Sequence, residues 1–428
     1  MRQTTRRIAL FFCFAFCLAA LSNLAQAQTF TVLHAFTGGA DGAGPASGVT
    51  LGGPGILYGT TSSGGTGGNG HDGVAFKLTQ RGSGWELEPL YEFNSEAGID
   101  PLGPLTFRNG ALYGTTEYGG AGGGGTVFEL QPPPTACKTS ICYWNETVLH
   151  SFAGGPNDGE NPYFTNLVFD QAGNLYGTTA YGGAGSGPFC NVRGGGNLGC
   201  GTAFQLSPSG GGWTFNIVHN FESNGIDGVQ PWFGMIFDAA GNLYGTTTYG
   251  GISSEEAGVA FELTPSGGAW TETILYDFVS DYQGGSAGAN YLVMDESGNL
   301  YGSYGTNEPQ IVAGIFELTR SEGGWSFSTL ATINACSVTG IARDTAGNFY
   351  GACSGGGQYD WGWVFELTNS GGSWTVTDLH DFTLGGDGGG PGPVVLDSSG
   401  NLYGTAGLGG ILGDCGLDGC GTVWEITP

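Results

Sequence analysis

Five aspartates have the residue type and the setting to bind a cation. Each lies in a loop-like stretch directly before Gly or Pro, and they are Asp41, Asp100, Asp158, Asp227 and Asp387. Ca²⁺ takes about six to eight oxygen ligands, and glycine permits the sharp turn that brings them together. None of these stretches has the dense Asp-x-Asp-x-Asp spacing of a self-contained Ca²⁺ loop. We therefore expect each aspartate to cap its own turn and expect no cofactor, with bound Ca²⁺ as the alternative.

A second candidate site is the aromatic and acidic stretch at residues 358–363 (QYDWGW). Exposed Trp and Tyr side chains offer flat apolar area with a polar edge, which suits stacking on a sugar ring. Tyr359, Asp360 and Trp361 therefore join the five aspartates as candidate ligand-binding residues. The alternative is that Trp363 packs into a strand and that Trp361 has no role.

Histidine is not predicted to do chemistry here. Four of the five histidines occupy one position of an internal repeat, where Tyr91 and Tyr276 stand in two other copies; they are His34, His150, His219 and His380. Exchange of His with Tyr indicates a packing position with a polar tip. No nucleophile elbow, zinc-protease helix, phosphate loop or dinucleotide fingerprint is present, so we predict no catalytic residue.

The elements that must position the candidates come from that repeat. Its core is residues 173–179 (GNLYGTT), and the core tyrosine recurs seven times, at Tyr58, Tyr113, Tyr176, Tyr244, Tyr301, Tyr350 and Tyr403. Each copy contains four short alternating runs bounded by turn residues, which predicts four strands. An Asp-x-x-Gly-Asn turn, as at residues 238–242, connects the run at 235–238 to the run at 243–247, and most copies have an equivalent turn.

Seven such units predict an all-β fold, a seven-bladed β-propeller of four-stranded antiparallel blades. A unit of this size cannot bury both faces of its sheet alone, so the units must pack against one another. The chain ends after the third strand of the last unit, and residues 29–36 (TFTVLHAF) resemble an outer strand. We expect residues 29–36 to pair with the last blade and close the ring, because an open edge is a liability.

The repeat GNLYGTT followed by GTVFEL resembles the Gloeo/Verruco tandem repeat of exported bacterial proteins. The resemblance implies an extracellular repeat protein without an assigned activity. Members often end in an anchoring tail, which does not follow Pro428 here, so a free secreted or periplasmic protein is expected.

The first residues predict export. Residues 1–27 combine a basic start, an apolar run too short to span a bilayer and an Ala-x-Ala cleavage pattern. We expect a signal peptide at 1–27, a single propeller domain at 28–428, and no membrane span after cleavage. In an oxidising compartment the remaining cysteines would form disulfides, which proximity assigns as Cys137–Cys142, Cys190–Cys200, Cys336–Cys353 and Cys415–Cys420.

The net charge of the chain limits the classes of partner that it can bind. The formal net charge of −27 disfavours binding to nucleic acid. The first hypothesis is a non-enzymatic exported protein that binds a ligand or partner, such as a glycan or a surface protein, through the face that carries the long loops. The alternatives are a secreted polysaccharide hydrolase or lyase and a structural cell-surface protein. Convergence of carboxylates outside the repeat would favour the hydrolase.

Overall fold

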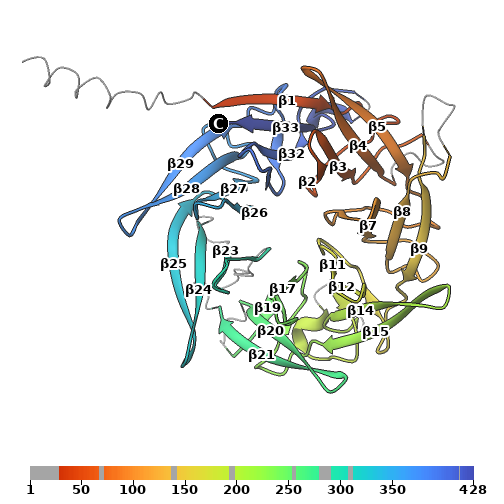
Figure 1. Cartoon of the computed structure of the whole chain (residues 1–428), viewed down its shortest axis with the longest axis vertical. Helices are drawn as coiled ribbons and strands as arrows, with labels where there is room; N and C mark the ends of the chain where they lie inside the picture. The colour runs from red at the N-terminus through yellow and green to blue at the C-terminus, as the bar shows by residue number, and fades with distance from the viewer. Residues whose placement is uncertain are drawn as a thin grey trace, which may run out of the picture.

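The computed structural model describes residues 28–66, 72–135, 142–191, 198–252, 257–278, 291–306, 312–413 and 415–428. In these ranges the chain is almost entirely β and forms six four-stranded antiparallel sheets and a seventh in which β30 is a fifth strand. The sheets stand around a central axis as the blades of a propeller (Figure 1). The predicted fold class is therefore confirmed.

Each blade runs from an inner strand at the axis to an outer strand at the rim. Blade 1 is β2 (Val49–Gly53), β3 (Ile56–Thr61), β4 (Val74–Arg81) and β5 (Gly84–Glu92). Blade 2 is β6 (Thr106–Arg108), β7 (Ala111–Thr116), β8 (Thr126–Gln131) and β9 (Asn145–Ser151). Blade 3 is β11 (Val168–Phe169), β12 (Leu175–Thr179), β14 (Thr202–Ser209) and β15 (Gly212–Asn220). Blade 4 is β17 (Ile236–Phe237), β18 (Leu243–Thr246), β20 (Val259–Ser266) and β21 (Ala269–Asp277).

The remaining blades follow the same order. Blade 5 is β22 (Val293–Met294), β23 (Leu300–Thr306), β24 (Val312–Ser321) and β25 (Gly324–Asn334). Blade 6 is β26 (Val338–Arg343), β27 (Phe349–Cys353), β28 (Trp363–Ser370) and β29 (Ser373–Asp381). Blade 7 is β31 (Val395–Leu396), β32 (Leu402–Leu408), β33 (Thr422–Thr427) and β1 (Thr29–Ala35).

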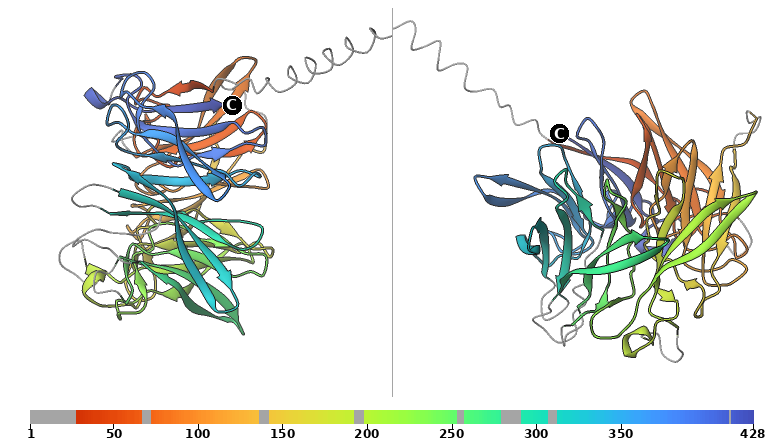
Figure 2. Two further views of the ribbon diagram at one scale, coloured as in Figure 1. Left: turned by 90° about the vertical axis from the view of Figure 1, so that its left-hand side faces the viewer. Right: turned by 60° about the horizontal axis from the view of Figure 1, so that its bottom comes forward.

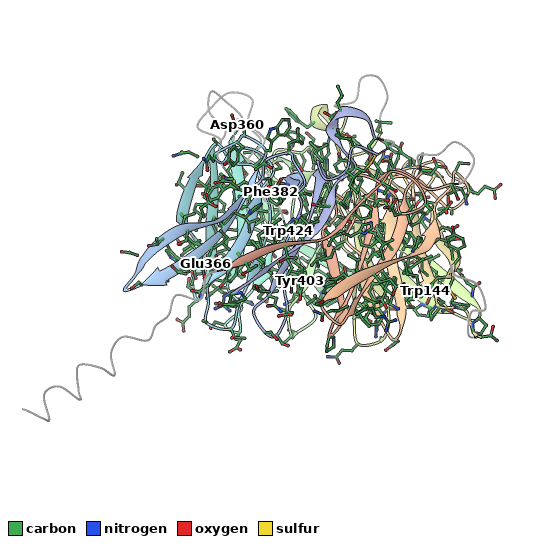
Figure 3. The ribbon with its side chains drawn as sticks, turned by 90° about the horizontal axis from the view of Figure 1, so that it is seen from above. Trp144, Asp360, Glu366, Phe382, Tyr403 and Trp424 are labelled. Atoms are coloured by element: carbon green, nitrogen blue, oxygen red, sulfur yellow. A yellow bond between two sulfur atoms is a disulfide. The ribbon has the colours of Figure 1, made fainter. Side chains whose placement is uncertain are left out.

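Two kinds of connection share one face of the ring. The loop that enters a blade pairs with the loop between its second and third strands, as β10 (Gly159–Glu160) with β13 (Tyr181–Gly182) and β16 (Gly228–Val229) with β19 (Tyr249–Gly250). On the same face, β30 (Gly389–Pro391) pairs with the end of β32, and the short 3₁₀ helices η1 (Pro188–Asn191) and η2 (Gly416–Asp418) lie in second-to-third loops. We call this the long-loop face. The side views show the disc that the blades form (Figure 2), and Asp360 lies at its long-loop edge (Figure 3).

The glycine of the Leu-Tyr-Gly core is required for space. A Cβ at Gly245 would lie 2.5 Å from Cζ of Phe261 on the next strand, and a Cβ at Gly404 would lie 2.3 Å from Cζ2 of Trp424. In every blade an aromatic ring at the equivalent position of the third strand covers the motif glycine. The other pairs are Gly59–Phe76, Gly114–Phe128, Gly177–Phe204, Gly302–Phe316 and Gly351–Phe365. These rings are fully buried and form the core of each blade. The motif therefore encodes a glycine-on-ring contact.

The turn aspartates are structural, as the sequence predicted. Asp238 accepts hydrogen bonds from the backbone and the side chain of Asn242 and from the Tyr244 hydroxyl. The Tyr244 hydroxyl also lies 2.8 Å from Oε1 of Glu262 on the next strand. Burial acts to raise the pKa of Asp238, but these hydrogen bonds outweigh burial and lower it. The same bonds to asparagine and tyrosine recur at Asp170, Asp295 and Asp397.

The first strand closes the ring. β1 pairs antiparallel with β33, from Thr29 opposite Thr427 to Ala35 opposite Thr422, beside one another in Figure 1. The Phe30 ring stacks on His380 of blade 6 at 3.6 Å and lies 5.9 Å from the ring of Trp424. The expected closure by residues 29–36 is consistent with this sheet. The predicted signal peptide at 1–27 lies outside the described residues.

Candidate functional site

Four of the five predicted aspartates meet the repeat histidines. The Nε2–carboxylate distances are 3.1 Å for His34–Asp41, 2.8 Å for His150–Asp158, 3.1 Å for His219–Asp227 and 3.3 Å for His380–Asp387. Each carboxylate also accepts a hydrogen bond from a backbone N–H early in its loop, donated by Thr37, Ala153, Glu222 or Thr383. Burial acts to raise the pKa of Asp41, but hydrogen bonds to His34 and Thr37 outweigh burial and lower it. These aspartates thus fasten the loop that enters the next blade to the outer strand before it.

Asp100 stands at a different position of the repeat. It directly precedes Pro101 and has a left-handed backbone, with φ of 55°. The residues that precede Pro45 and Pro391 are Gly44 and Gly390, with φ of 67° and 62°. Burial, with a smaller effect of Asp72, raises the pKa of Asp100. Ala97, not Asp100, takes the place of the histidine-bound aspartate in this loop.

This pre-proline position carries the most informative departures from the repeat. Asn161 precedes Pro162 with φ of 53°, and Gln230 precedes Pro231 with φ of 57°. A left-handed backbone favours glycine and costs other residues conformational energy. Strained positions of this kind cluster at ligand sites. Both side chains are buried, and both line the same pocket.

The pocket, which we call the aromatic pocket, lies on the long-loop face where the loops of blades 2, 3 and 4 meet. Its volume is about 190 Å³, and its lining is Glu117, Asn161, Tyr163, Ala180, Tyr181, Gln230, Trp232 and Tyr249. The Trp232 ring lies 5.4 Å from the Tyr163 ring and 6.4 Å from the Tyr249 ring. Aromatic walls around a few buried polar groups are typical of small-molecule sites.

Gln230 supplies the polar end of the aromatic pocket. Its side-chain N–H donates to the Phe189 carbonyl at 3.0 Å, and its backbone N–H donates to the Cys200 carbonyl at 2.8 Å. Both acceptors belong to the enlarged loop of blade 3 that the Cys190–Cys200 disulfide closes. Gln230 is 1% exposed, and its Oε1 has no hydrogen-bond partner within the described ranges. A buried acceptor of this kind is costly unless a ligand or water fills it.

A second pocket opens at the axis beside the first. It measures about 310 Å³ and is lined mainly by apolar groups, among them Phe164, Phe233 and Tyr291. Phe164 and Phe233 follow directly the aromatic-pocket residues Tyr163 and Trp232. The Tyr291 hydroxyl donates to the Phe164 carbonyl at 2.7 Å, so this axial pocket and the aromatic pocket share the same loops.

The aromatic stretch predicted on blade 6 lies elsewhere on the long-loop face. Tyr359 is 48% exposed and Trp361 is 38% exposed, while Trp363 is half-buried at the start of β28. Asp360 is exposed and has a left-handed backbone with φ of 64°. None of the three predicted residues lines a pocket among those found in the described ranges.

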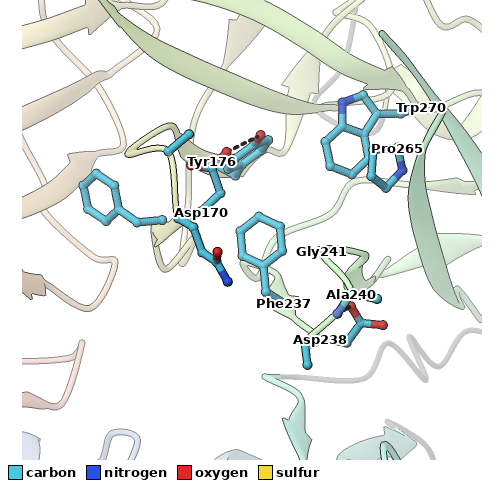
Figure 4. Close-up of a pocket in the computed structure, with 12 residues that line it drawn as sticks. Asp170, Tyr176, Phe237, Asp238, Ala240, Gly241, Pro265 and Trp270 are labelled. Atoms are coloured by element: carbon cyan, nitrogen blue, oxygen red, sulfur yellow. Dashed lines mark hydrogen bonds between the residues drawn. The ribbon is translucent and has the colours of Figure 1, made fainter. Parts of the chain in front are cut away.

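The opposite face carries grooves between neighbouring blades. One, of about 620 Å³, lies between blades 3 and 4, with Tyr176, Phe237 and Trp270 projecting around it (Figure 4). Its counterpart of about 520 Å³ between blades 7 and 1 has Tyr403 and Trp85 at the same repeat positions. Because both grooves are lined by repeat residues whose carboxylates serve the turns, we assign them to the architecture.

Three of the four predicted disulfides are present: Cys190–Cys200, Cys336–Cys353 and Cys415–Cys420. Cys142 is also disulfide-bonded, and its predicted partner Cys137 lies outside the described residues. No helix in the described ranges has the length and hydropathy to cross a membrane.

Solved structures of several proteins are similar to this chain at low identity. A candidate 6-phosphogluconolactonase from Bacteroides uniformis is similar in structure, with 14% identity, a TM-score of 0.50, and coverage of 78% of this chain and 84% of that one. The periplasmic gluconolactonase of Pseudomonas aeruginosa has the same identity and coverage and a TM-score of 0.48. The PQQ-bound aldose sugar dehydrogenase of Streptomyces coelicolor has 12% identity, covers 93% of this chain and 98% of that one, and has a TM-score of 0.45.

At this identity the first of these similarities, with its TM-score of 0.50, shows the fold alone, and no curated protein matches the chain in sequence. The repeat itself is identified directly, because residues 19–189 match the profile of the Gloeobacter/Verrucomicrobia repeat. Residues 19–189 of this β-propeller therefore carry the Gloeobacter/Verrucomicrobia repeat.

Proposed function

We propose that the protein is an exported carbohydrate-binding propeller and that the aromatic pocket is its binding site. The observation that carries the proposal is that Gln230 lines a pocket with Tyr163, Trp232 and Tyr249, while its buried Oε1 has no partner within the described ranges. A sugar hydroxyl would donate to this oxygen while the apolar face of the sugar ring lies against an aromatic wall.

The size of the aromatic pocket fits a small ligand. At about 190 Å³ it is smaller than the roughly 300–1,000 Å³ of drug-sized ligand sites. One pyranose ring, or the end of a longer chain, is the unit that we expect it to hold. Binding of an end would leave the rest of a glycan free to cross the long-loop face toward the axial pocket.

Binding is favoured over the two alternatives. Glycoside hydrolysis commonly uses two carboxyl groups about 5–9.5 Å apart. Glu117 is the one carboxyl-bearing residue that lines the aromatic pocket in the part of the chain that the structure describes. A purely structural protein would need no concave site, whereas the described residues of this face form two pockets.

Export is the second half of the proposal. Structural disulfides form and persist in oxidising compartments, and three lie wholly within the described residues. They accompany the signal-like sequence of residues 1–27. The site of action would then be the periplasm or the cell exterior.

A glycan array with matched variants tests the binding proposal. Gln230→Gly removes the amide at a position where the repeat also uses Gly44 and Gly390, so the backbone accepts the change. Trp232→Ala removes the aromatic wall, and Trp361→Ala is the control on the same face. We expect both pocket variants to lose at least about tenfold in affinity, which corresponds to about 1.4 kcal/mol, and the control to bind normally. Absence of binding by the unaltered protein, or equal binding by all variants, would reject the proposal.

A further inference from the structure

A cluster of three potential ligands lies at the rim between blades 3 and 4. His219 comes from β15, Asp227 from the loop that enters blade 4, and Glu272 from β21. Their ligand atoms all lie within 4.8 Å of one another. His219 Nε2 is 3.1 Å from Asp227 Oδ2 and 3.6 Å from Glu272 Oε2. We call these three residues the rim cluster.

Glu272 distinguishes this blade junction from the others that have a histidine and an aspartate. Glu272 lies on the outer strand of its blade, opposite a leucine of the third strand. The residues that pair with the equivalent Leu or Ile in the other three blades are Leu87, Phe215 and Phe30. Phe215 and Phe30 stack on the histidine of the preceding blade, at 4.2 Å and 3.6 Å. At the rim cluster a carboxyl replaces that apolar contact, so packing alone does not account for it.

The carboxyls of the rim cluster retain unused ligand atoms. Asp227 is 5% exposed, and its Oδ1 has no hydrogen-bond partner in the described ranges; the same is true of Glu272 Oε1. No lysine or arginine of the described residues forms an ion pair with either carboxyl. Two carboxyls buried side by side are costly to ionise, and a bound cation would offset their negative charge.

From this geometry we propose that the rim cluster binds a divalent transition-metal ion, with Zn²⁺ as the best match. Zn²⁺ binds histidine nitrogen and carboxylate oxygen at about 2.0–2.2 Å, and a tetrahedral site of these bonds has ligands roughly 3.3 Å apart. The distances from His219 Nε2 to Asp227 Oδ2 and to Glu272 Oε2, 3.1 Å and 3.6 Å, lie on either side of that value, and all three ligand atoms are within 4.8 Å of one another. One nitrogen and two oxygens also suit borderline metals better than Ca²⁺, which takes oxygen ligands. Water completes the fourth position.

The site would hold the loop that carries the pocket residue Gln230, since Asp227 precedes it by only three positions. The inference does not depend on the proposed carbohydrate function. Its evidence is the ligand geometry and the contrast between blades, and its test measures metal binding alone.

The test uses the full chain after a chelator has removed any bound metal. Calorimetry then measures the binding of added Zn²⁺, and mass spectrometry counts the metal ions bound per chain. We expect about one tightly bound Zn²⁺ per chain and a higher melting temperature with metal. Glu272→Gln and Glu272→Leu should weaken binding at least about tenfold. Glu146→Gln is the matched control, since Glu146 occupies the same strand position in blade 2 opposite Leu130, next to Tyr91 and no histidine–aspartate pair.

Loss of folding is separated from loss of metal by a spectroscopic measurement. Co²⁺ in the unaltered protein should give the visible absorption of a tetrahedral nitrogen–oxygen site, and Glu272→Gln should abolish that absorption while the far-ultraviolet circular dichroism stays unchanged. Failure of the unaltered protein to bind Zn²⁺, or equal binding by both Glu272 variants and the control, would overturn the proposal.

Discussion

Replacing Phe30 by alanine tests how the ring is closed. Phe30 lies on β1, the strand that the start of the chain adds to blade 7, and stacks on His380 of the neighbouring blade at 3.6 Å. It also packs edge-on against Phe382 at 5.8 Å. One side chain therefore joins the closing strand of blade 7 to blade 6.

The magnitude follows from these contacts. Phe→Ala at a fully buried site costs about 3–5 kcal/mol. Phe30 is half-buried, so about half of that value applies, and its aromatic pairs add about 0.5–1 kcal/mol. We expect a loss of about 2–3 kcal/mol in the free energy of unfolding. An unfolding entropy of about 2.1 cal/mol/K per residue makes this roughly a 3 °C fall in the melting temperature of a chain this long.

Differential scanning calorimetry measures the shift, and hydrogen exchange locates it. Thr31→Ala is the control, because Thr31 is exposed on the same strand and should change the melting temperature little. The backbone amides of residues 422–427 should exchange faster in Phe30→Ala because β33 pairs with β1. A Phe30→Ala protein with the stability of Thr31→Ala and unchanged exchange at 422–427 would refute closure by this strand.

Two further predictions concern the repeat and the blade junctions. Gly351→Ala should destabilise the protein by about 1–3 kcal/mol in chemical denaturation, because its Cβ would lie 2.4 Å from the Phe365 ring, whereas Gly323→Ala meets nothing within 4 Å and should be tolerated. Equal effects of the two changes would contradict the glycine-on-ring contact. Burial raises the pKa of Glu146 from an ordinary 4.5 to about 7, so the folded protein retains a proton that the unfolded chain releases, and stability falls as the pH rises through that window. Glu146→Gln should therefore raise the melting temperature more at pH 8 than at pH 5, and an equal gain at both would count against the shift.

The sequence predicts the architecture well because the same pattern of strands and turns occurs in seven copies. The number of copies of the core motif predicts the number of blades, and the turn residues within each copy predict four strands per blade. Tyr176 and its equivalents mark the second strand, and the lone strand at 29–36 predicts the closing pair that β1 and β33 form. Pairing of cysteines by proximity also succeeds at Cys190–Cys200, because the repeat keeps both ends of each loop together.

The candidate site is predicted less well. The repeated aspartates are visible in the sequence, but their bonds to His34, His150, His219 and His380 depend on the path of each loop back to the outer strand. The aromatic pocket depends on contacts among three blades, which the sequence of one unit does not show. One signal was present, because Asn161 and Gln230 replace glycine before proline. Departure from a repeat at a position that requires a left-handed backbone is therefore worth searching for.

The central claim is that the aromatic pocket holds a sugar. Its most direct test is a crystal structure of the protein with the saccharide that binds tightest on the array. We predict a sugar ring against Trp232 with a hydroxyl donating to Oε1 of Gln230. A saccharide bound instead beside Tyr359 and Trp361 or in an inter-blade groove, with no sugar at Gln230, would contradict the account.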